Sequence, residues 1–225
     1  MELLHEACQL NNAGAALLGS NKGSSAVHML KKALVIMERL SRDEGSEDLI
    51  MMTTEEASAE TEAIHQPFVE VPRMQDTFFV YNRALVLTDG NGISVDLAFS
   101  NATILFNLAL AFHQRGWAFC EEAKLRRAIH LYDLVVRLVS HSDSSARHGT
   151  LAIVALNNQA HVHRELCEFQ EACLILDEVF TVAEHVLPSQ ESPLSSSDAF
   201  GSALLDEIFL NATISSQMPS TAASA

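Results

Sequence analysis

The feature that most restricts what this chain can fold into is a spacing of apolar residues that recurs in pairs. The central copy occupies positions i, i+4 and i+7 twice, with Leu105, Ala109, Phe112 and then Ala128, Tyr132, Val135. This spacing places three side chains on one stripe of an α-helix. A small residue where two helices cross lets their backbones approach closely, and larger neighbours fill the adjacent groove. The pattern therefore predicts two helices that pack against each other.

The same pattern appears once before and once after the central copy. The N-terminal copy has Leu10, Gly14, Leu17 and then Ala26, Leu30, Ala33; the later copy has Leu156, Ala160, His163 and then Ala172, Leu176, Val179. All three have a large, a small and a large residue on the first helix. An all-α chain of repeated helical pairs is the fold class that this repetition predicts.

This arrangement resembles the tetratricopeptide repeat, whose signature has a small residue facing an alanine near the crossing of the pair. The signature tryptophan is replaced by Leu10, Leu105 or Leu156, and the closing proline is missing from all three second helices. The resemblance implies a right-handed α–α superhelix of about three tetratricopeptide-like helical pairs plus a C-terminal capping helix. An ordinary helical bundle is the alternative. The run 78–87 and the following 101–110 also resemble a large group of uncharacterised repeat-like proteins.

The chain divides by composition into stretches of one domain. We expect a first helical pair (1–40), an acidic flexible loop (41–66), a β-hairpin insertion (67–92), a second helical pair (93–139), a linker and third helical pair (140–188), a Ser/Pro loop (189–197), a capping helix (198–218) and a tail (219–225). In the acidic loop like charges repel and little apolar surface is available. Extra turn residues are expected in the central pair between Gly116 and Ala128, and Ser94 or Asp96 opens its first helix.

The hairpin is predicted from two runs that are rich in β-branched and aromatic residues. They are 68–71 and 78–87, and the stretch from Pro72 to Asp76 separates them. Such composition favours strands. Because an isolated hairpin is marginally stable in water, this one is expected to lie on the helices.

Charge and composition limit the partners that we expect. The formal net charge is −15, which disfavours nucleic acid and anionic membrane surfaces and favours a basic peptide or protein segment, or serves solubility alone. The N-terminus does not look like a signal peptide, and no run of about 18 apolar residues is present to span a membrane. We therefore expect an intracellular, cytoplasmic protein whose four cysteines are reduced.

A row of asparagines is the most informative polar feature. Asn12, Asn107 and Asn158 each stand two residues before the small residue of their first helix, and Asn211 joins them if the last helix is a fourth first helix. Two residues correspond to a rotation of about 200°, so these amides point away from the partner helix, toward the concave face. In tetratricopeptide families, asparagines at this place bind the backbone of an extended peptide. An amide offers a donor and an acceptor that match a peptide group. The alternative is that they only join neighbouring helices.

Further along the same face, repeat register places His113, Gln114, His161, Arg164 and Glu165. These side chains are expected to supply selective contacts to a peptide, or else to form a solvated face. The lysines with which some tetratricopeptide proteins grip a terminal carboxylate are absent.

No catalytic or metal constellation stands out in the sequence. His163 and Cys167 lie one helical turn apart, but zinc usually needs four ligands. Cys120 with His113, and His130 with Asp133, lack the further groups that a nucleophile or an acid–base pair requires. We expect no cofactor and no enzymatic activity. The prediction is a protein–protein interaction adaptor that binds a peptide on its concave face; a structural or self-associating helical subunit is the alternative, and the oligomeric state is left open.

Overall fold

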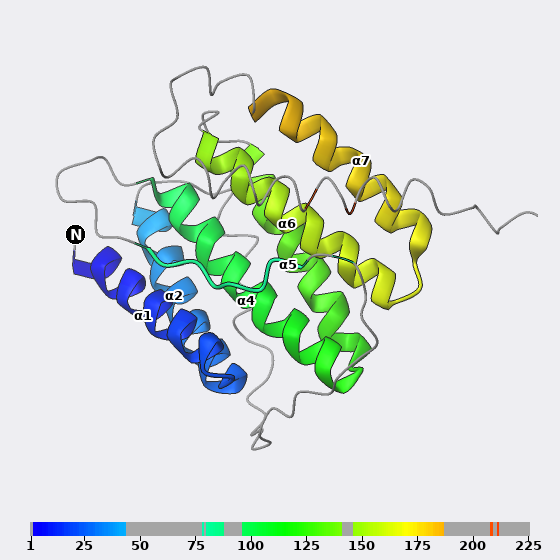
Figure 1. Ribbon diagram of the computed structural model, residues 1–225. Coiled ribbons are helices and arrows are strands. Elements are labelled where there is room, and N and C mark those ends of the chain that lie inside the picture. Colours follow the sequence, from blue (N-terminus) through cyan, green and yellow to red (C-terminus); the bar gives the residue numbers. More distant parts are fainter. Residues whose placement is uncertain are drawn as a thin grey trace, which may run out of the picture.

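A computed structural model describes residues 2–43, 78, 80–87, 96–140, 146–186, 208 and 211 of the chain. This part contains six long helices and no strand. The helices are α1 (Glu2–Gly19), α2 (Gly23–Asp43), α4 (Leu97–Phe119), α5 (Glu122–Ser140), α6 (Ala146–Glu165) and α7 (Phe169–Val186). They lie in sequence order across the molecule, and residues 80–87 run across α6, α4 and α1 as a single extended segment (Figure 1). The all-α prediction is confirmed for the described residues.

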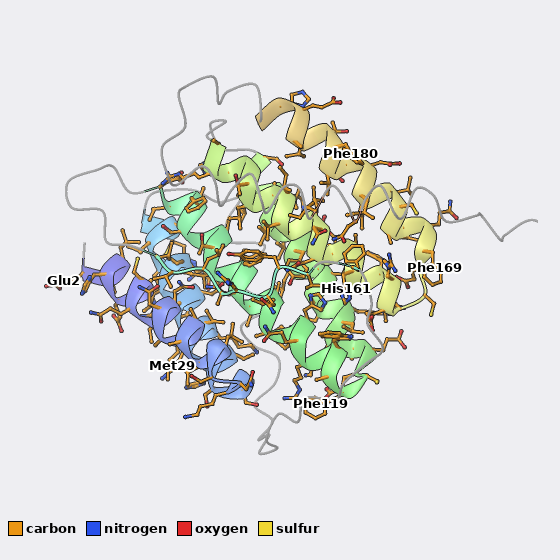
Figure 2. The ribbon with its side chains drawn as sticks, viewed as in Figure 1. Glu2, Met29, Phe119, His161, Phe169 and Phe180 are labelled. Atoms are coloured by element: carbon orange, nitrogen blue, oxygen red, sulfur yellow. The ribbon has the colours of Figure 1, made fainter. Side chains whose placement is uncertain are left out.

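The helices pack as three consecutive pairs. The closest packing joins α1 to α2, α4 to α5 and α6 to α7, and the pairs contact each other through α2 with α4 and α5 with α6. The apolar positions predicted for all three second helices are at most 2% exposed, and the small residues Gly14, Ala109 and Ala160 are also buried. A Cβ on Gly14 would stand 2.8 Å from Leu30 Cγ, so α1 and α2 approach as closely as the missing side chain allows. Side chains of neighbouring helices lie between their ribbons (Figure 2).

The turn inside each pair has the same geometry. Its central residue is left-handed: Asn21 at φ 56°, Cys120 at φ 55° and Cys167 at φ 62°. The next N–H donates to a carbonyl five residues earlier, in Lys22→Leu17 (2.9 Å), Glu121→Gly116 (2.9 Å) and Glu168→His163 (2.8 Å). This is the Schellman ending, in which a left-handed residue lets the next N–H satisfy a carbonyl of the last helical turn.

The extra residues of the central pair are helical and do not enlarge its turn. Only Cys120 and Glu121 separate α4 from α5, so both helices are prolonged toward the turn. Gly116 makes this possible, because a Cβ there would meet the Leu125 backbone nitrogen at 2.9 Å. The predicted extra turn residues are therefore corrected to helix.

The start of α4 and the end of α2 are two helix boundaries that the structure locates more closely than the sequence does. Asp96 caps α4, since its carboxylate accepts a hydrogen bond from Phe99 N–H at 2.9 Å. Helix α2 continues through 41–43, three residues into the predicted acidic loop. There the Ser41 hydroxyl donates to the Met37 carbonyl, and Arg42 pairs with Glu38 one turn away.

Other predictions lie wholly or partly outside the described residues. The rest of the acidic loop, the first run of the hairpin, the Ser/Pro loop and the tail are among them. Of the predicted capping helix, Ile208 and Asn211 are described, and both are helical and buried. None of the described helices combines the length and apolar character that crossing a membrane requires.

Candidate functional site

Three amides on three different first helices converge on one non-helical segment. Asn12 lies on α1, Asn107 on α4 and Asn158 on α6, and each holds a backbone position within residues 81–87 of the same chain. The segment crosses α6, α4 and α1 in that order as its residue number rises (Figure 1). We call Asn12, Asn107 and Asn158 the asparagine row and residues 78–87 the resident segment.

Each amide of the row binds both the N–H and the C=O of one residue. The pairs, with the distance from backbone N to Oδ1 and then from Nδ2 to backbone O, are Asn158 with Tyr81 (3.0 and 2.9 Å), Asn107 with Leu85 (2.7 and 2.7 Å) and Asn12 with Leu87 (2.8 and 2.8 Å). An amide used in this way copies the paired hydrogen bonds of a neighbouring β-strand. The row therefore satisfies the backbone of the resident segment although the segment has no strand partner among the described residues.

Amides next to the row join the helices laterally. Asn107 Nδ2 donates to Asn11 Oδ1 at 2.8 Å, and Asn11 Nδ2 donates to the Leu85 carbonyl at 3.1 Å. Asn211 Nδ2 donates to Asn157 Oδ1 at 2.7 Å, which repeats the relation of Asn107 to Asn11. Asn211 is thus hydrogen-bonded to α6, and its membership of the asparagine row stays a prediction. These amides therefore hold the backbone of the chain's own segment and also join neighbouring helices.

The resident segment buries some side chains against the helices and exposes others. Phe78, Tyr81 and Leu87 are at most 9% exposed, whereas Val86 is 63% exposed. The Tyr81 ring lies 6.1 Å from the Phe106 ring, centroid to centroid. Burial raises the pKa of the Tyr81 hydroxyl, and nearby Arg83 partly opposes this. The segment is thus held by apolar anchors as well as by backbone hydrogen bonds.

Phe78 lies against two residues that the sequence predicts for this face. The Arg164 guanidinium stands 4.8 Å from the centroid of the Phe78 ring, and the His161 ring is tilted against it at 5.5 Å. The Trp117 ring meets His161 edge-on at 5.6 Å. We call this group, Trp117, His161 and Arg164, the aromatic corner.

A buried polar network links the aromatic corner to the row. His113 Nε2 lies 3.0 Å from His161 Nδ1, and His113 Nδ1 lies 3.3 Å from the Tyr132 hydroxyl. That hydroxyl also accepts a hydrogen bond from Asn158 Nδ2 at 3.2 Å. Burial, and then the neighbouring His161, hold the pKa of His113 well below its usual value. Burial raises the pKa of Tyr132, and the hydrogen bond from Asn158 partly offsets this rise.

The prediction of a solvated face is wrong for the two histidines. His113 is 2% exposed and His161 is 1% exposed. Gln114, by contrast, remains near the surface and donates a long 3.4 Å bond to the Asn82 carbonyl. The histidines are covered because the resident segment and Trp117 lie over this end of the face.

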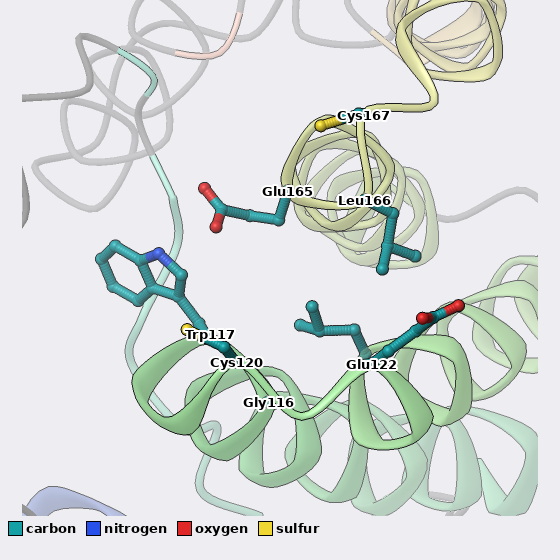
Figure 3. Close-up of a pocket in the computed structure, with 8 residues that line it drawn as sticks. Gly116, Trp117, Cys120, Glu122, Glu165, Leu166 and Cys167 are labelled. Atoms are coloured by element: carbon teal, nitrogen blue, oxygen red, sulfur yellow. The ribbon is translucent and has the colours of Figure 1, made fainter.

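A pocket of about 310 Å³ adjoins the aromatic corner. Its lining is Gly116, Trp117, Cys120, Glu122, Leu125, Glu165, Leu166 and Cys167. Trp117, at the end of α4, and Glu165, at the end of α6, stand on the same side of it (Figure 3). Glu165 also approaches His161, with Oε1 3.7 Å from Nε2. The pocket and the aromatic corner therefore share Trp117.

The weak catalytic and metal candidates acquire other partners. His163 Nδ1 lies 2.8 Å from Glu168 Oε2, and Asp133 pairs with Arg137 at 2.6 Å. Within the described ranges, no cluster of three or more His, Cys, Asp or Glu residues is arranged to hold a metal ion. The four cysteines form no disulfide with one another.

The sequence predicts that a hairpin containing residues 78–87 lies on the helices, but it does not predict that this run binds the asparagine row. The run 78–87 was predicted to be half of a hairpin, yet residues 80–87 form no strand and bind helix side chains. A signal was present, because a strand-like run with no neighbouring strand needs other hydrogen-bond partners. The sequence predicts Tyr132 as an apolar core position and does not predict that its hydroxyl joins a polar network.

Comparison with known proteins gives no relative: no protein-family model, curated protein or solved structure matches this chain.

Proposed function

We propose that this chain is a non-enzymatic protein–protein interaction adaptor that binds an extended peptide segment on the concave face of a tetratricopeptide-like superhelix. One observation carries the proposal: three amides, from α1, α4 and α6, each bind the N–H and C=O of a single residue in a segment that crosses them. The face is thus equipped to hold an extended backbone.

Recognition through the backbone suits an adaptor. Paired amide bonds to N–H and C=O give affinity without demanding particular side chains, as when a peptide adds to the edge of a β-sheet. Selectivity then comes from pockets for alternate side chains. Here Phe78, Tyr81 and Leu87 are the buried side chains among the described residues of the segment.

In this proposal the resident segment occupies the face as an internal ligand. A segment on the same chain competes at an effective concentration in the millimolar range. A partner therefore has to displace it, and binding is weak until the segment is loosened. The charge of −15 favours a partner segment with basic residues at its outward positions.

A structural or self-associating subunit is the second candidate. Two observations favour it: the row is already hydrogen-bonded to the chain's own segment, and α7 exposes three large apolar residues, Phe169, Leu174 and Phe180. In that case the segment is a permanent strap and α7 meets another copy. Light scattering over a range of concentrations tests this candidate, which predicts a mass that rises with concentration.

The experiment for the adaptor uses the full chain and a single loosening substitution. Leu85→Pro removes the N–H that donates to Asn107 Oδ1. Val86→Pro is the matched control, because Val86 is an exposed neighbour. We expect Leu85→Pro to bind an array of extended peptides more strongly than wild type or Val86→Pro. Adding Asn158→Ala should abolish that gain.

The opposite result is equally clear. If Leu85→Pro keeps the helical circular dichroism of wild type and binds no more peptide than Val86→Pro, then the segment is a permanent strap. The adaptor proposal then fails.

A further inference from the structure

Phe78 is the resident side chain with the most specific surroundings. It is 8% exposed, and its ring has a cation 4.8 Å from its centroid and a tilted imidazole at 5.5 Å. A guanidinium within about 6 Å of an aromatic centroid is attracted to the negative face of the ring. An aliphatic side chain of similar size has no such face.

The aromatic corner is built by the helices and not by the segment. Trp117 comes from α4, and His161 and Arg164 come from α6. His161 is fixed by His113 on one side, at 3.0 Å, and by the edge of Trp117 on the other. It lies among packed side chains and not at the rim of the molecule (Figure 2). A corner positioned in this way persists when the segment above it is exchanged.

The corner stands in fixed register with the asparagine row. Phe78 precedes by three residues the residue that Asn158 holds by both backbone groups, Tyr81. Tyr81 is itself buried against Phe106, and Leu87 is buried at the residue that Asn12 holds. The amides and the side-chain sites therefore define one spacing along the face that the resident segment covers, which we call the groove.

We propose that the partner of this groove is an extended segment with an aromatic residue three positions before the residue held by Asn158, and that the aromatic corner selects it. Resting on the proposed adaptor function, this names the partner class: an aromatic residue, a second aromatic three positions later and an aliphatic residue six positions after that. The resident segment, with Phe78, Tyr81 and Leu87, is the internal copy of this pattern. Among the described residues between the anchors, Asn82, Arg83 and Val86 are exposed, and these positions are free to vary.

The test uses full-length protein whose resident segment has lost two anchors, Phe78→Ala/Leu87→Ala, with every groove residue intact. The probe is a fluorescein-labelled synthetic peptide with the sequence of residues 76–88, measured by fluorescence polarisation. Three altered peptides accompany it: Phe78→Ala, Phe78→Leu and the matched control Val86→Ala, which changes an exposed position. Circular dichroism verifies that the receptor is folded. If the double substitution prevents folding, the single Leu87→Ala variant is the receptor.

We expect the parent and Val86→Ala peptides to bind the altered receptor with equal affinity. Both should bind it more tightly than they bind wild-type protein. The Phe78→Ala peptide should bind about thirtyfold more weakly, as for a truncated buried aromatic anchor. The Phe78→Leu peptide should lie between them. On a receptor that also carries Arg164→Met, the difference between the parent and Phe78→Leu peptides should shrink.

Failure of this inference and failure of the adaptor function give different results. Equal binding of the parent, Phe78→Leu and Phe78→Ala peptides would overturn the aromatic selection and leave backbone binding in place. Absence of binding by every peptide to a folded receptor would overturn both. Selectivity for Phe78 that is unchanged by Arg164→Met would remove the cation from the corner's role and overturn the selection as proposed here.

Discussion

Asn107 is the side chain on which the hydrogen bonds of the row converge. It is fully buried, holds both backbone groups of Leu85 and donates to Asn11. Asn107→Ala leaves these groups without their partner, and we expect the free energy of unfolding to fall by about 3 kcal/mol. Chemical denaturation measures this fall.

The control for this substitution is Asn82→Ala. Asn82 is an exposed asparagine in the resident segment, so its loss should change stability by no more than about 0.5 kcal/mol. Similar effects at the two positions would mean that the row does not contribute to stability through its hydrogen bonds.

The buried histidine pair gives the stability a pH dependence. His113 has a depressed pKa because of burial and of His161, and Tyr132 and Glu165 are the other titratable groups of the same network. Above about pH 6.5 His113 is neutral in both the folded and the unfolded chain, so its protonation does not change the free energy of unfolding. Below that value the unfolded chain takes up a proton that the folded chain resists, so stability falls as pH falls.

The size and the control of this effect follow from linkage. One such group contributes a slope of at most about 1.4 kcal/mol per pH unit. Denaturation of wild type and His113→Asn between pH 7.5 and 5 should show a shallower loss in the variant. Identical slopes would show that His113 does not resist protonation.

The residue scale also shows where sequence reasoning ends. Register alone placed Asn12, Asn107 and Asn158 on one face, because three copies with one small crossing residue fix the rotation of each helix. The same reasoning could not tell that His113 and His161 are covered. That depends on a segment from another part of the chain, and helical periodicity contains no information about it.

At the scale of elements, the close approach of paired helices depends on glycine, which has no side chain. Gly116→Ala would put a Cβ 2.9 Å from the Leu125 backbone nitrogen, which cannot rotate away, and we expect a loss of about 2 kcal/mol. Gly19→Ala is the control, since a Cβ there meets nothing within 4 Å. It should be neutral or slightly stabilising. Thermal unfolding of both variants compares them, and equal melting temperatures would contradict the tight contact.

The resident segment should show an uneven pattern of amide protection. The N–H groups of Tyr81, Leu85 and Leu87 donate to the row, whereas Arg83 and Val86 have exposed side chains. Hydrogen exchange followed by NMR should therefore be slower at the first three amides. Uniformly fast exchange along 80–87 would mean that the segment is not held.

The helices were more predictable than the segment for a physical reason. An α-helix satisfies its own backbone, so spacing and caps such as Asp96 are sufficient to locate it. The resident segment satisfies its backbone on side chains that lie 22 to 77 residues away in sequence. Its composition predicts a strand paired with residues 68–71. That run lies outside the described residues, and residues 80–87 form no strand and bind the asparagine row.

At the scale of the whole molecule, the net charge of −15 acts on association. If the groove exchanges its segment, peptides with lysine at the outward positions 82 and 86 should associate about tenfold faster than peptides with glutamate there at low salt. The difference should shrink as salt screens the charges. Stopped-flow fluorescence on the loosened receptor gives both rates, and rates that are equal at low salt would show that the overall charge does not steer the partner.

The spacing of the row has one more consequence. Its amides take hold of the chain at residues 81, 85 and 87, intervals of four and two. A strand turns over with every residue, so even intervals present the same side of the backbone at each grip. Adding or deleting one residue between two held residues would turn the backbone N–H and C=O of the second toward solvent. The face therefore selects the number of residues between the held positions. It tolerates changes of side chain between them and rejects a ligand that has one residue more or one fewer there.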